Sequence, residues 1–560
     1  MSEPRIYRQI VQVGRRQVHL RHAGSGPRLL LIHGSPASSE YFIPLVGQLS
    51  GSYCCISPDT PGFGESAALP AAGISIAALA MATAELIETL QCAPCLVLGS
   101  HSGAAIALEL ATLRPDLVSG LVIDGLPMFT ADELDGYYQS FFEQLQVDER
   151  GGHFARTWTR IRDMFIWFPW TSHDPARLNG MDLPPAPTAH KWVSMLYQSA
   201  PNYVSIYRAA VSYGERAAVA AATQTIPTLY MAHDRDMLAP HLSRLPKLKA
   251  CDRVELTSSA PGFWLDAVRR GLRELALDSA STLGELNPPV HAHAEDRFVV
   301  LPEGQLRLRR YGAIDSPPLL MLHDAPASGR SLHSLAVALS SDACVWLPDL
   351  PGCGASEPLA HNTPVLQDYA ETLGALMATL GAGPIAVYGR GCGASLALIL
   401  ACMQPERVSR VLLDELPLAG PDVGLPDERI CAPITIEPDG SHWFRTWQML
   451  RDSQIFWPWY LTTADHLLRL PGNYDGEFMH DWVRQVMEQP ETAHLLPHAV
   501  CNLDAGTLLA QLTQPTTLLS RIGHPLGRAA AAAVTRSPQL LTLQLHDDGR
   551  ADELRRLLNQ

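Results

Sequence analysis

The chain has 560 residues, of which 47% are hydrophobic and 18% charged, and its formal net charge is −15. This length exceeds what one hydrophobic core usually covers, so the sequence predicts at least two globular domains. The negative charge argues against a nucleic acid or an anionic membrane as a partner, and no basic stripe opposes that interpretation.

No apolar run approaches the ~18 residues that a membrane-spanning helix needs. Residues 1–9 lack the apolar core of a signal peptide, and the eleven cysteines are scattered through the chain. Together these features lead us to expect a cytoplasmic protein. Residues 92–95 form a CxxC without a second Cys/His pair at zinc spacing. We therefore favour buried thiols over a metal or redox site, and expect neither a metal nor a cofactor.

The first half of the chain alternates predicted strands and helices. In chain order these are a hairpin over 8–13 and 16–23, a buried strand over 28–34, a strand running into a Gly/Pro loop over 54–66, a buried strand over 93–99 and a helix over 104–113. Buried apolar strands that alternate with helices predict a mostly parallel sheet. Residues 129–219 interrupt this alternation because they are helical and rich in aromatic side chains. We expect them to form a cap over the sheet.

The second half of the chain repeats the first. The motifs that begin at Leu29, Ser57 and Val122 recur 290 residues later, at Leu319, Leu347 and Leu412. In the helical region, residues 153–170 match residues 442–459 without a gap, and nine of the eighteen positions are identical. A match of this length indicates a tandem duplication.

The duplication predicts the domain boundaries. We expect the first unit over 1–280 and the second over 293–560. The linker at 281–292 is small, polar and proline-bearing. The constant offset places the second cap at about 419–509.

Four motifs of the first unit recur in order in the second. They are HGSPAS (33–38), DTPGFGES (59–66), GSHSG (99–103) and YMAHDRDMLAP (230–240). They resemble the oxyanion loop, the D-x-P-G-x-G-x-S loop, the nucleophile elbow and the acid-bearing strand of the capped branch of the α/β-hydrolase superfamily. The resemblance implies an α/β fold of two tandem units, each a mostly parallel eight-stranded sheet flanked by helices with an inserted helical cap. It implies that Asp236 is the catalytic acid and that Asp59 and Asp349 are structural.

The nucleophile elbow admits two registers. A tight strand-to-helix turn needs small residues two positions before and two after its central residue. Glycines flank His101 in this way, whereas Ser100 and Ala104 flank Ser102. In related sequences a ridge of small residues begins six positions after the nucleophile, and Ala107 lies six after His101 but five after Ser102. This spacing favours His101 as the elbow residue.

Neither unit has a complete Ser–His–Asp set. The first unit has no histidine after its last predicted strand. In the second, Gly391 occupies the elbow, His524 the acid position, and only His546 falls near the expected histidine. A hydroxyl without a base is a poor nucleophile at neutral pH. The sequence therefore disfavours ordinary serine hydrolysis in both units and predicts that the second is inactive.

The first unit keeps groups that can transfer a proton. His101 titrates near neutrality and would act as acid and base, with Asp236 as its partner and Asp124 as a second candidate. The resemblance implies an oxyanion hole built from the backbone N–H groups of Ser35 and Ser102. Ser102 remains a catalytic candidate through the second register. The alternative is that His101 is a leftover in a dead site or a packed core histidine.

The predicted cap carries candidate substrate-binding residues. Trp158 and Arg162 share one helical face, and Trp167 follows them. A face of this kind would bind a small apolar or aromatic molecule with an anionic group, in hydrolysis or in cofactor-free lyase or isomerase chemistry. The alternative is a non-catalytic small-molecule binding protein on a decayed hydrolase scaffold. With either function, the two units could pair as an intramolecular pseudo-dimer.

Overall fold

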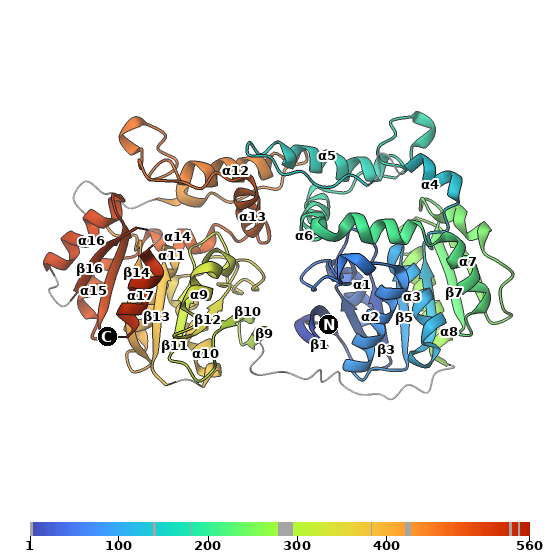
Figure 1. Ribbon diagram of the computed structural model, residues 1–560, viewed down its shortest axis with the longest axis horizontal. Helices are drawn as coiled ribbons and strands as arrows, with labels where there is room; N and C mark the ends of the chain where they lie inside the picture. The colour runs from blue at the N-terminus through green and yellow to red at the C-terminus, as the bar shows by residue number, and fades with distance from the viewer. Residues whose placement is uncertain are drawn as a thin grey trace. The chain divides into compact units, whose positions relative to one another are not determined.

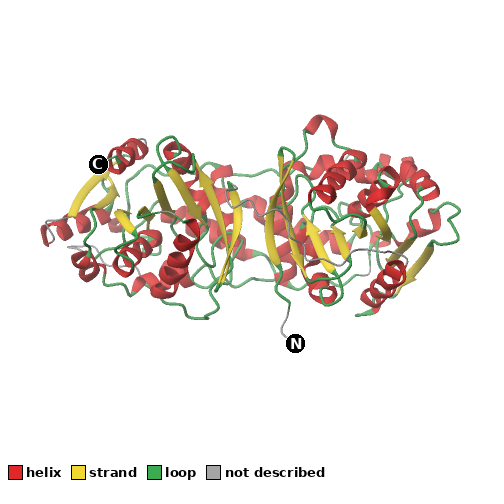
Figure 2. Cartoon of the chain, turned by 90° about the horizontal axis from the view of Figure 1, so that it is seen from below, coloured by secondary structure: helices red, strands yellow, loops and turns green. Residues whose placement is uncertain are grey.

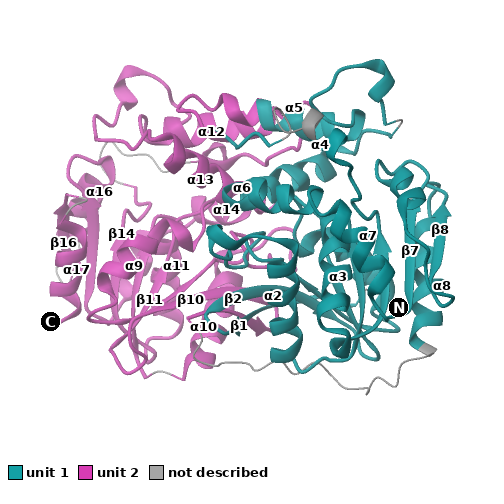
Figure 3. Ribbon diagram, turned by 45° about the vertical axis from the view of Figure 1, so that its right-hand side comes forward, with its two compact units in different colours: residues 1–146, 156–291 teal, residues 147–155, 292–560 magenta. Residues whose placement is uncertain are grey.

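The computed structural model describes residues 4–137, 142–179, 181–277, 295–381, 383–419, 427–536, 540–546 and 549–559. The linker expected at 281–292 lies outside these residues. The chain divides into two compact units, one formed by 1–146 and 156–291 and the other by 147–155 and 292–560 (Figure 3).

Unit 1 is built on an eight-stranded sheet (Figure 1). Its strands are β1 (Tyr7–Val13), β2 (Arg16–Ala23), β3 (Arg28–Ile32), β4 (Cys54–Pro58), β5 (Cys95–Ser100), β6 (Val118–Asp124), β7 (Thr228–His233) and β8 (Arg253–Thr257). They lie in the order β1-β2-β4-β3-β5-β6-β7-β8. β2 is antiparallel to β1 and β4, and the other pairs are parallel. The apolar runs of β3, β4 and β5 are buried along almost their whole length, as strands covered on both faces must be.

Helices cover both faces of this sheet. α1 (Ile43–Leu49) and α8 (Phe263–Leu277) share one core with the sheet, while α2 (Ile76–Thr89), α3 (Ser102–Leu113) and α7 (Gly214–Thr223) pack together. Between β6 and α7 the chain forms α4 (Ala131–Tyr137), α5 (Gly152–Ile166) and α6 (Ala186–Val211). Because this insertion leaves the sheet at the carboxyl end of β6, it caps the edge where the active site of such folds lies. Figure 1 shows α6 lying across the top of unit 1.

Unit 2 repeats this topology. Its strands are β9 (Asp296–Leu301), β10 (Gly304–Tyr311), β11 (Pro318–Leu322), β12 (Cys344–Pro348), β13 (Ile385–Arg390), β14 (Val408–Asp414), β15 (Thr516–Arg521) and β16 (Leu540–Leu545). They lie in the order β9-β10-β12-β11-β13-β14-β15-β16, and only the pairs made by β10 are antiparallel. Figure 2 shows strands layered between helices in each unit. The predicted fold class, two tandem units with mostly parallel eight-stranded sheets, is confirmed.

The helices of unit 2 also follow the pattern of unit 1. α9 (His333–Leu339) and α17 (Arg550–Leu558) contribute to one core, and α10 (Leu366–Leu380), α11 (Cys392–Met403) and α15 (Ala505–Gln511) to the other. α16 (Pro525–Arg536) packs on β15 and β16. The insertion after β14 contains α12 (Ser441–Ser453), α13 (Gly476–Met487) and α14 (Leu495–Cys501). In the part of the chain described above, no helix combines the length and apolar character needed to cross a membrane.

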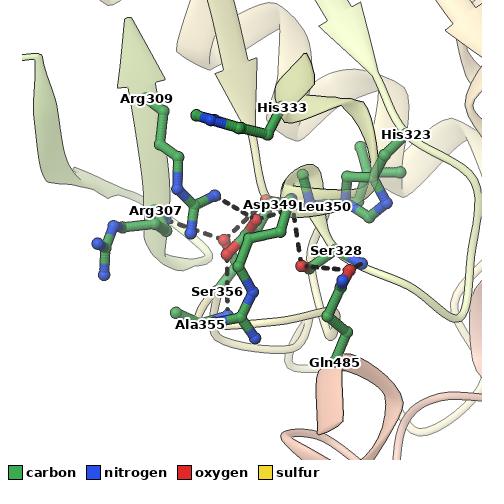
Figure 4. Close-up of polar contacts among 12 residues, drawn as sticks. Arg307, Arg309, His323, Ser328, His333, Asp349, Leu350, Ala355, Ser356 and Gln485 are labelled. Atoms are coloured by element: carbon green, nitrogen blue, oxygen red, sulfur yellow. Dashed lines mark hydrogen bonds and ion pairs between the residues drawn. The ribbon is translucent and has the colours of Figure 1, made fainter. Parts of the chain in front are cut away.

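A buried aspartate fixes the loop after β12 (Figure 4). Asp349 accepts hydrogen bonds from Arg309 Nη1 at 2.7 Å and from the backbone N–H groups of Gly329 and Ala355 at 2.9 and 3.0 Å. Burial opposes ionisation, but Arg309 holds the pKa of Asp349 well below its usual range. In unit 1, Asp59 accepts from His19 Nδ1 at 2.8 Å. The backbone N–H groups of Ser39 and Glu65 also donate to Asp59, so each carboxylate ties a strand to the surrounding loops, as a structural residue does.

Candidate active site

His101 forms the turn between β5 and α3. Its backbone has φ 52° and ψ −114°, a strained conformation for a residue with a side chain. The flanking glycines are required, because a Cβ on Gly99 would lie 2.3 Å from the carbonyl oxygen of Gly103, and one on Gly103 would lie 2.1 Å from that of Ile32. The structure thus places His101 in the strained turn, with Ser102 as the first residue of the helix.

The His101 ring lies over Gly125 and bonds to Asp236. Its Nε2 is 2.9 Å from Asp236 Oδ2. A Cβ on Gly125 would lie 2.5 Å from the ring carbon Cδ2, so only glycine leaves room for this arrangement. Asp236 Oδ1 accepts the backbone N–H of Leu238 at 2.7 Å, which fixes the carboxylate. The His101 side chain is 38% exposed and that of Asp236 5%, so the pair is accessible from the histidine side.

The charges of the pair stabilise one another. Withdrawal from water would lower the pKa of His101, but the charge and hydrogen bond of Asp236, with a contribution from Asp124, raise it to about 9. Burial would raise the pKa of Asp236, but the His101 charge and hydrogen bond lower it to about 2. At neutral pH the pair is therefore an imidazolium and a carboxylate. The Nε2 proton points to Asp236, and no described residue forms a hydrogen bond to Nδ1.

Asp124, the second candidate partner, forms hydrogen bonds with other residues and not with His101. Its carboxylate accepts from Ser100 Oγ at 3.4 Å and from Trp264 Nε1 at 3.2 Å. Burial and the like charge of Asp236 raise the pKa of Asp124 to about 6, although His101 and both hydrogen bonds oppose the rise. It acts on His101 through its charge, and no hydrogen bond joins its carboxylate to the ring.

Sequence reasoning did not identify three residues around this pair. Gly125 provides the space under the imidazole, and Ser100 and Trp264 hold Asp124. Trp264 lies in the segment after the last strand of unit 1, where the family resemblance places the triad histidine and this sequence has none. The position of this segment could have indicated that Trp264 is near the site. The sequence does not show, however, that its indole N–H donates to Asp124.

The expected oxyanion hole is partly occupied by a hydroxyl. The backbone N–H of Ser35 donates to Ser102 Oγ at 2.7 Å, and the two hydroxyl oxygens are 3.0 Å apart. Ser102 Oγ therefore already satisfies one of the two predicted donors. A substrate oxygen would have to displace it to use the Ser35 N–H. No described histidine forms a hydrogen bond to the Ser102 hydroxyl.

The cap residues expected to bind substrate occupy different environments. Trp158 is buried, with 3% exposure, Arg162 is half-buried on α5, and Trp167 packs edge-to-face on His173 with a centroid distance of 5.0 Å.

Another arginine of α5 is enclosed by aromatic rings. The Arg160 guanidinium lies 4.6 Å from the ring centroid of Trp170 and 5.1 Å from that of Tyr203. Its Nε and Nη2 atoms are buried without a hydrogen-bond partner among the described residues. Arg160, which the sequence did not single out, therefore has two buried donor atoms without a geometric hydrogen-bond partner in the described part of the cap.

In unit 2, charged side chains surround the equivalent turn. Gly391 has φ 55° and ψ −120°. Glu415 accepts from Arg521 Nε at 2.6 Å and from Arg390 Nη2 at 3.3 Å. His524 is buried, and burial lowers its pKa to about 4. Glu415 stands 290 positions after Gly125, so unit 2 has an ion-paired glutamate where unit 1 has the glycine under His101.

Among the residues that the structure describes, neither unit shows a candidate metal centre. The described part of the chain contains no group of three or more His, Cys, Asp or Glu side chains placed to hold a metal ion. Cys92 and Cys95 are both buried free thiols.

Comparison with known proteins agrees with this architecture. The sequence matches the alpha/beta hydrolase fold family over residues 27–260 and 317–430, well over half of the chain. The chain belongs to the α/β hydrolase fold family. The two matched regions fall in the two units, so the family relationship extends to both.

Relatives of this hydrolase-fold chain have different activities. It is 42% identical over 94 residues to the magnesium-chelatase 30 kDa subunit of Rhodobacter capsulatus, covering 17% of this chain and 33% of the relative. It is 35% identical over 126 residues to 2-(acetamidomethylene)succinate hydrolase of Mesorhizobium japonicum (22% and 45%), and 31% identical over 120 residues to haloalkane dehalogenase 2 of Mycobacterium tuberculosis (21% and 42%). The chain thus spans less than half the length of these curated relatives.

Solved structures of hydrolases cover about one unit. The crystal structure of E-2-(acetamidomethylene)succinate hydrolase matches 48% of this chain and 100% of its own, with 23% identity and a TM-score of 0.38. An evolved potato epoxide hydrolase matches 48% and 100%, with 21% identity and a TM-score of 0.38.

Proposed function

We propose that unit 1 is an enzyme that acts on a small apolar or aromatic carbonyl compound bearing an anionic group, with His101 as its acid–base residue. The observation that carries the proposal is the hydrogen bond between His101 and Asp236 at the strained turn. A strained backbone costs about 1–3 kcal/mol, and such positions cluster where a side chain must be presented to a ligand. A histidine held there by a buried carboxylate has the form of a positioned proton-transfer group.

The ionisation of the pair favours a particular first step. With the pKa of His101 raised to about 9, the imidazole is protonated near neutrality. Its Nε2–H is bound to Asp236, which leaves Nδ1–H to donate to a carbonyl oxygen or a leaving group. After donation, the neutral Nδ1 can accept a proton from water or from carbon. His101 therefore acts first as an acid and then as a base, a cycle that suits both hydrolysis and proton-transfer chemistry at a carbonyl.

The cap supports an anionic substrate. The buried Nε and Nη2 of Arg160 have no described partner, and the flanking Trp170 and Tyr203 rings suit an apolar or aromatic body. A relative of this chain is a hydrolase of a substituted succinate, which is a dicarboxylate. We accordingly place a substrate carboxylate on Arg160 and the reacting carbonyl at His101.

A non-catalytic binding protein is the second candidate. The occupation of the Ser35 N–H by Ser102 Oγ favours it, because a hole closed by a hydroxyl stabilises no oxyanion until that hydroxyl moves. Such a protein would bind the same class of ligand in unit 1 without converting it.

Turnover of a panel of aromatic and dicarboxylic esters and amides separates these candidates. His101→Gln is expected to lower any turnover by about 10²–10⁴-fold, the usual contribution of a positioned acid–base group. His361→Gln, at an exposed histidine of unit 2, is the matched control and is expected to leave turnover unchanged. If compounds raise the melting temperature of the wild type but none is converted, the binding protein is favoured. Turnover that survives His101→Gln would exclude the proposed mechanism.

A further inference from the structure

The sheet of unit 1 ends in a strand with an exposed apolar face. β8 is the last strand of this sheet and pairs only with β7 in the described part of the chain (Figure 3). Val254 is 50% exposed and Leu256 60%. Side chains alternate between the two faces of a strand, so these two residues share one face, while Arg253 and Glu255 share the other. The face with Val254 and Leu256 is therefore apolar and open to solvent.

The corresponding strand of unit 2 has polar side chains at these positions. β16 pairs with β15 as β8 pairs with β7, and the two registers align Gln544 with Leu256 and Thr542 with Val254. The helix α16 covers this face of β16. It packs on both β15 and β16 (Figure 1), and a Cβ on its Gly527 would lie 2.8 Å from Gln544 Nε2.

Unit 1 has no such helix between β7 and β8. Residues 234–252 are all described, and they contain the short 3-10 helix η5 (Ala239–Arg244) and no α-helix. The apolar side chains thus stand in the unit that leaves this face uncovered, and the polar ones in the unit that covers it. Burial within one unit favours the opposite distribution, so Val254 and Leu256 are suited to a contact outside the fold.

The outer edge of β8 offers its backbone for pairing. The carbonyl of Thr257 accepts the N–H of Asp234, the residue that directly follows β7. Backbone N–H and C=O groups alternate in direction along a strand, so those of Val254 and Leu256 point away from β7. A second extended strand can add to an edge of this kind.

The charges on β8 fit a second copy of the same strand. Arg253 forms an ion pair with Glu274 of α8. Glu255 forms one with Arg270 of the same helix. When two β8 strands pair antiparallel with Val254 at a twofold axis, Arg253 of each copy lies opposite Glu255 of the other. Each such contact extends the existing ion pairs into a row of four alternating charges.

The packing favours the same register. With Val254 at the axis, the two valines face each other and each Leu256 lies diagonal to a valine, so four apolar side chains cover one another. Leu256 then lies opposite Asp252, whose carboxylate is buried and accepts the Thr228 N–H of its own chain. With Glu255 at the axis, two carboxylates would face each other directly, which is destabilising.

We propose that β8 is the interface of a homodimer, in which two copies of the chain pair antiparallel about a twofold axis at Val254. The same strand contributes from both sides, as in an isologous contact, and the sheets of the two first units become continuous. The proposal rests on β8 and α8 alone, so it is independent of what unit 1 binds or converts.

Sedimentation velocity of the full-length protein tests the dimer. The wild type is expected to pass from monomer to dimer as its concentration rises. Leu256→Lys places a charge in the apolar cluster and should raise the dissociation constant more than about tenfold. Leu541→Lys is the matched control, because Leu541 is 56% exposed on β16, the edge strand of unit 2, and should leave the dimer unchanged. A wild type that stays monomeric, or a dimer that survives Leu256→Lys or is lost in Leu541→Lys, would overturn the proposal.

Charge reversal tests the register. Arg253→Glu and Glu255→Arg each place like charges opposite one another in the homodimer, so each variant alone should dimerise more than about tenfold more weakly. In a mixture of the two variants, the heterodimer again has opposite charges at both contacts and should recover most of the wild-type affinity. Labelling one variant with a fluorophore detects this heterodimer, and thermal melting shows that both variants are folded. Undiminished homodimers, or no recovery when the folded variants are mixed, would contradict the pairing. Leu256→Lys keeps the test decisive if a charge variant does not fold.

Discussion

Replacing Asp236 with asparagine should convert His101 from a cation into a neutral imidazole at pH 7. Asparagine keeps the size of the side chain and an acceptor oxygen, but it removes the charge that lies 2.9 Å from His101 Nε2. Without that charge, withdrawal from water becomes the dominant influence on the pKa of His101 and lowers it. We expect the pKa to fall from about 9 to below the ordinary value of 6.5.

The same substitution changes the stability of unit 1 in a defined pH range. A rise from 6.5 to about 9 corresponds to roughly 3 kcal/mol at 1.36 kcal/mol per pKa unit. The His101 side chain is 38% exposed, and solvent screening reduces this figure to about 1–2 kcal/mol. Because the folded-state pKa is raised, the stabilisation is fully present below about pH 6.5 and is lost as the pH rises through about 9. Asp236→Asn should therefore cost about 1–2 kcal/mol at pH 6, and little above pH 9.

The measurement combines an NMR titration with denaturation. Histidine labelled with ¹³C at Cε1 gives the pKa of His101 once its signal is assigned from its loss in His101→Gln. Urea unfolding at several pH values gives the stability difference. Asp234→Asn is the control, because Asp234 is exposed, lies two residues away and accepts a hydrogen bond from the Ser259 N–H rather than from His101. A wild-type His101 pKa at or below 6.5, unchanged by Asp236→Asn, would refute the ion pair and the acid-first mechanism with it.

Three other predictions concern packing, reactivity and burial. Gly125→Ala should destabilise the protein by about 1–3 kcal/mol more than Gly14→Ala in urea unfolding. Both glycines have positive φ, 63° and 57°, but the new methyl would lie 2.5 Å from the His101 ring only at Gly125; equal losses would contradict this packing. Ser102 should resist a fluorophosphonate probe, because its hydroxyl contacts no described histidine, and stoichiometric labelling seen by intact-protein mass spectrometry would show the opposite. Arg309→Ala should cost about 3–5 kcal/mol in the same unfolding assay, since it leaves a buried carboxylate unpaired, and a near-neutral effect would exclude that role.

Much of the fold could be predicted because the duplication and the apolar runs supply independent signals. The strand expected over 93–99 is β5, Cys95–Ser100, and it begins later because Pro94 has no N–H to donate to a neighbouring strand. The end of the first cap was harder to place. α7 packs on α3 as part of the core, although it lies partly within the helical stretch expected over 129–219. Amphipathic helices of a cap and of a sheet-covering layer have the same pattern, so periodicity cannot separate them.

The parts of the site that depend on local sequence motifs could be predicted, but the contacts between distant segments could not. The spacing of small residues around His101 and the motif that contains Asp236 are local signals, and the structure brings these two residues together. The cap arginine was missed for a geometric reason. Arg160 and Arg162 are two positions apart and so lie about 200° apart around a helix, on opposite faces. Without knowing which face of α5 meets aromatic rings, the sequence alone does not choose between them.

The elbow of unit 2 shows why a motif cannot be interpreted from its own residues alone. Within the turn itself, Gly391 shows only that the side chain present at His101 in unit 1 is absent in unit 2. The replacement comes from Asp324, 67 positions earlier in the chain, and the two are linked because the Asp324 carboxylate lies where a side chain on Gly391 would begin. In unit 1 the same contact joins Gly34 to His101. An aspartate at position 34 would crowd His101, and a side chain at position 391 would collide with Asp324, so the two positions constrain each other in both units. The absence of a side chain at Gly391 and the position of the Asp324 carboxylate are therefore linked by packing.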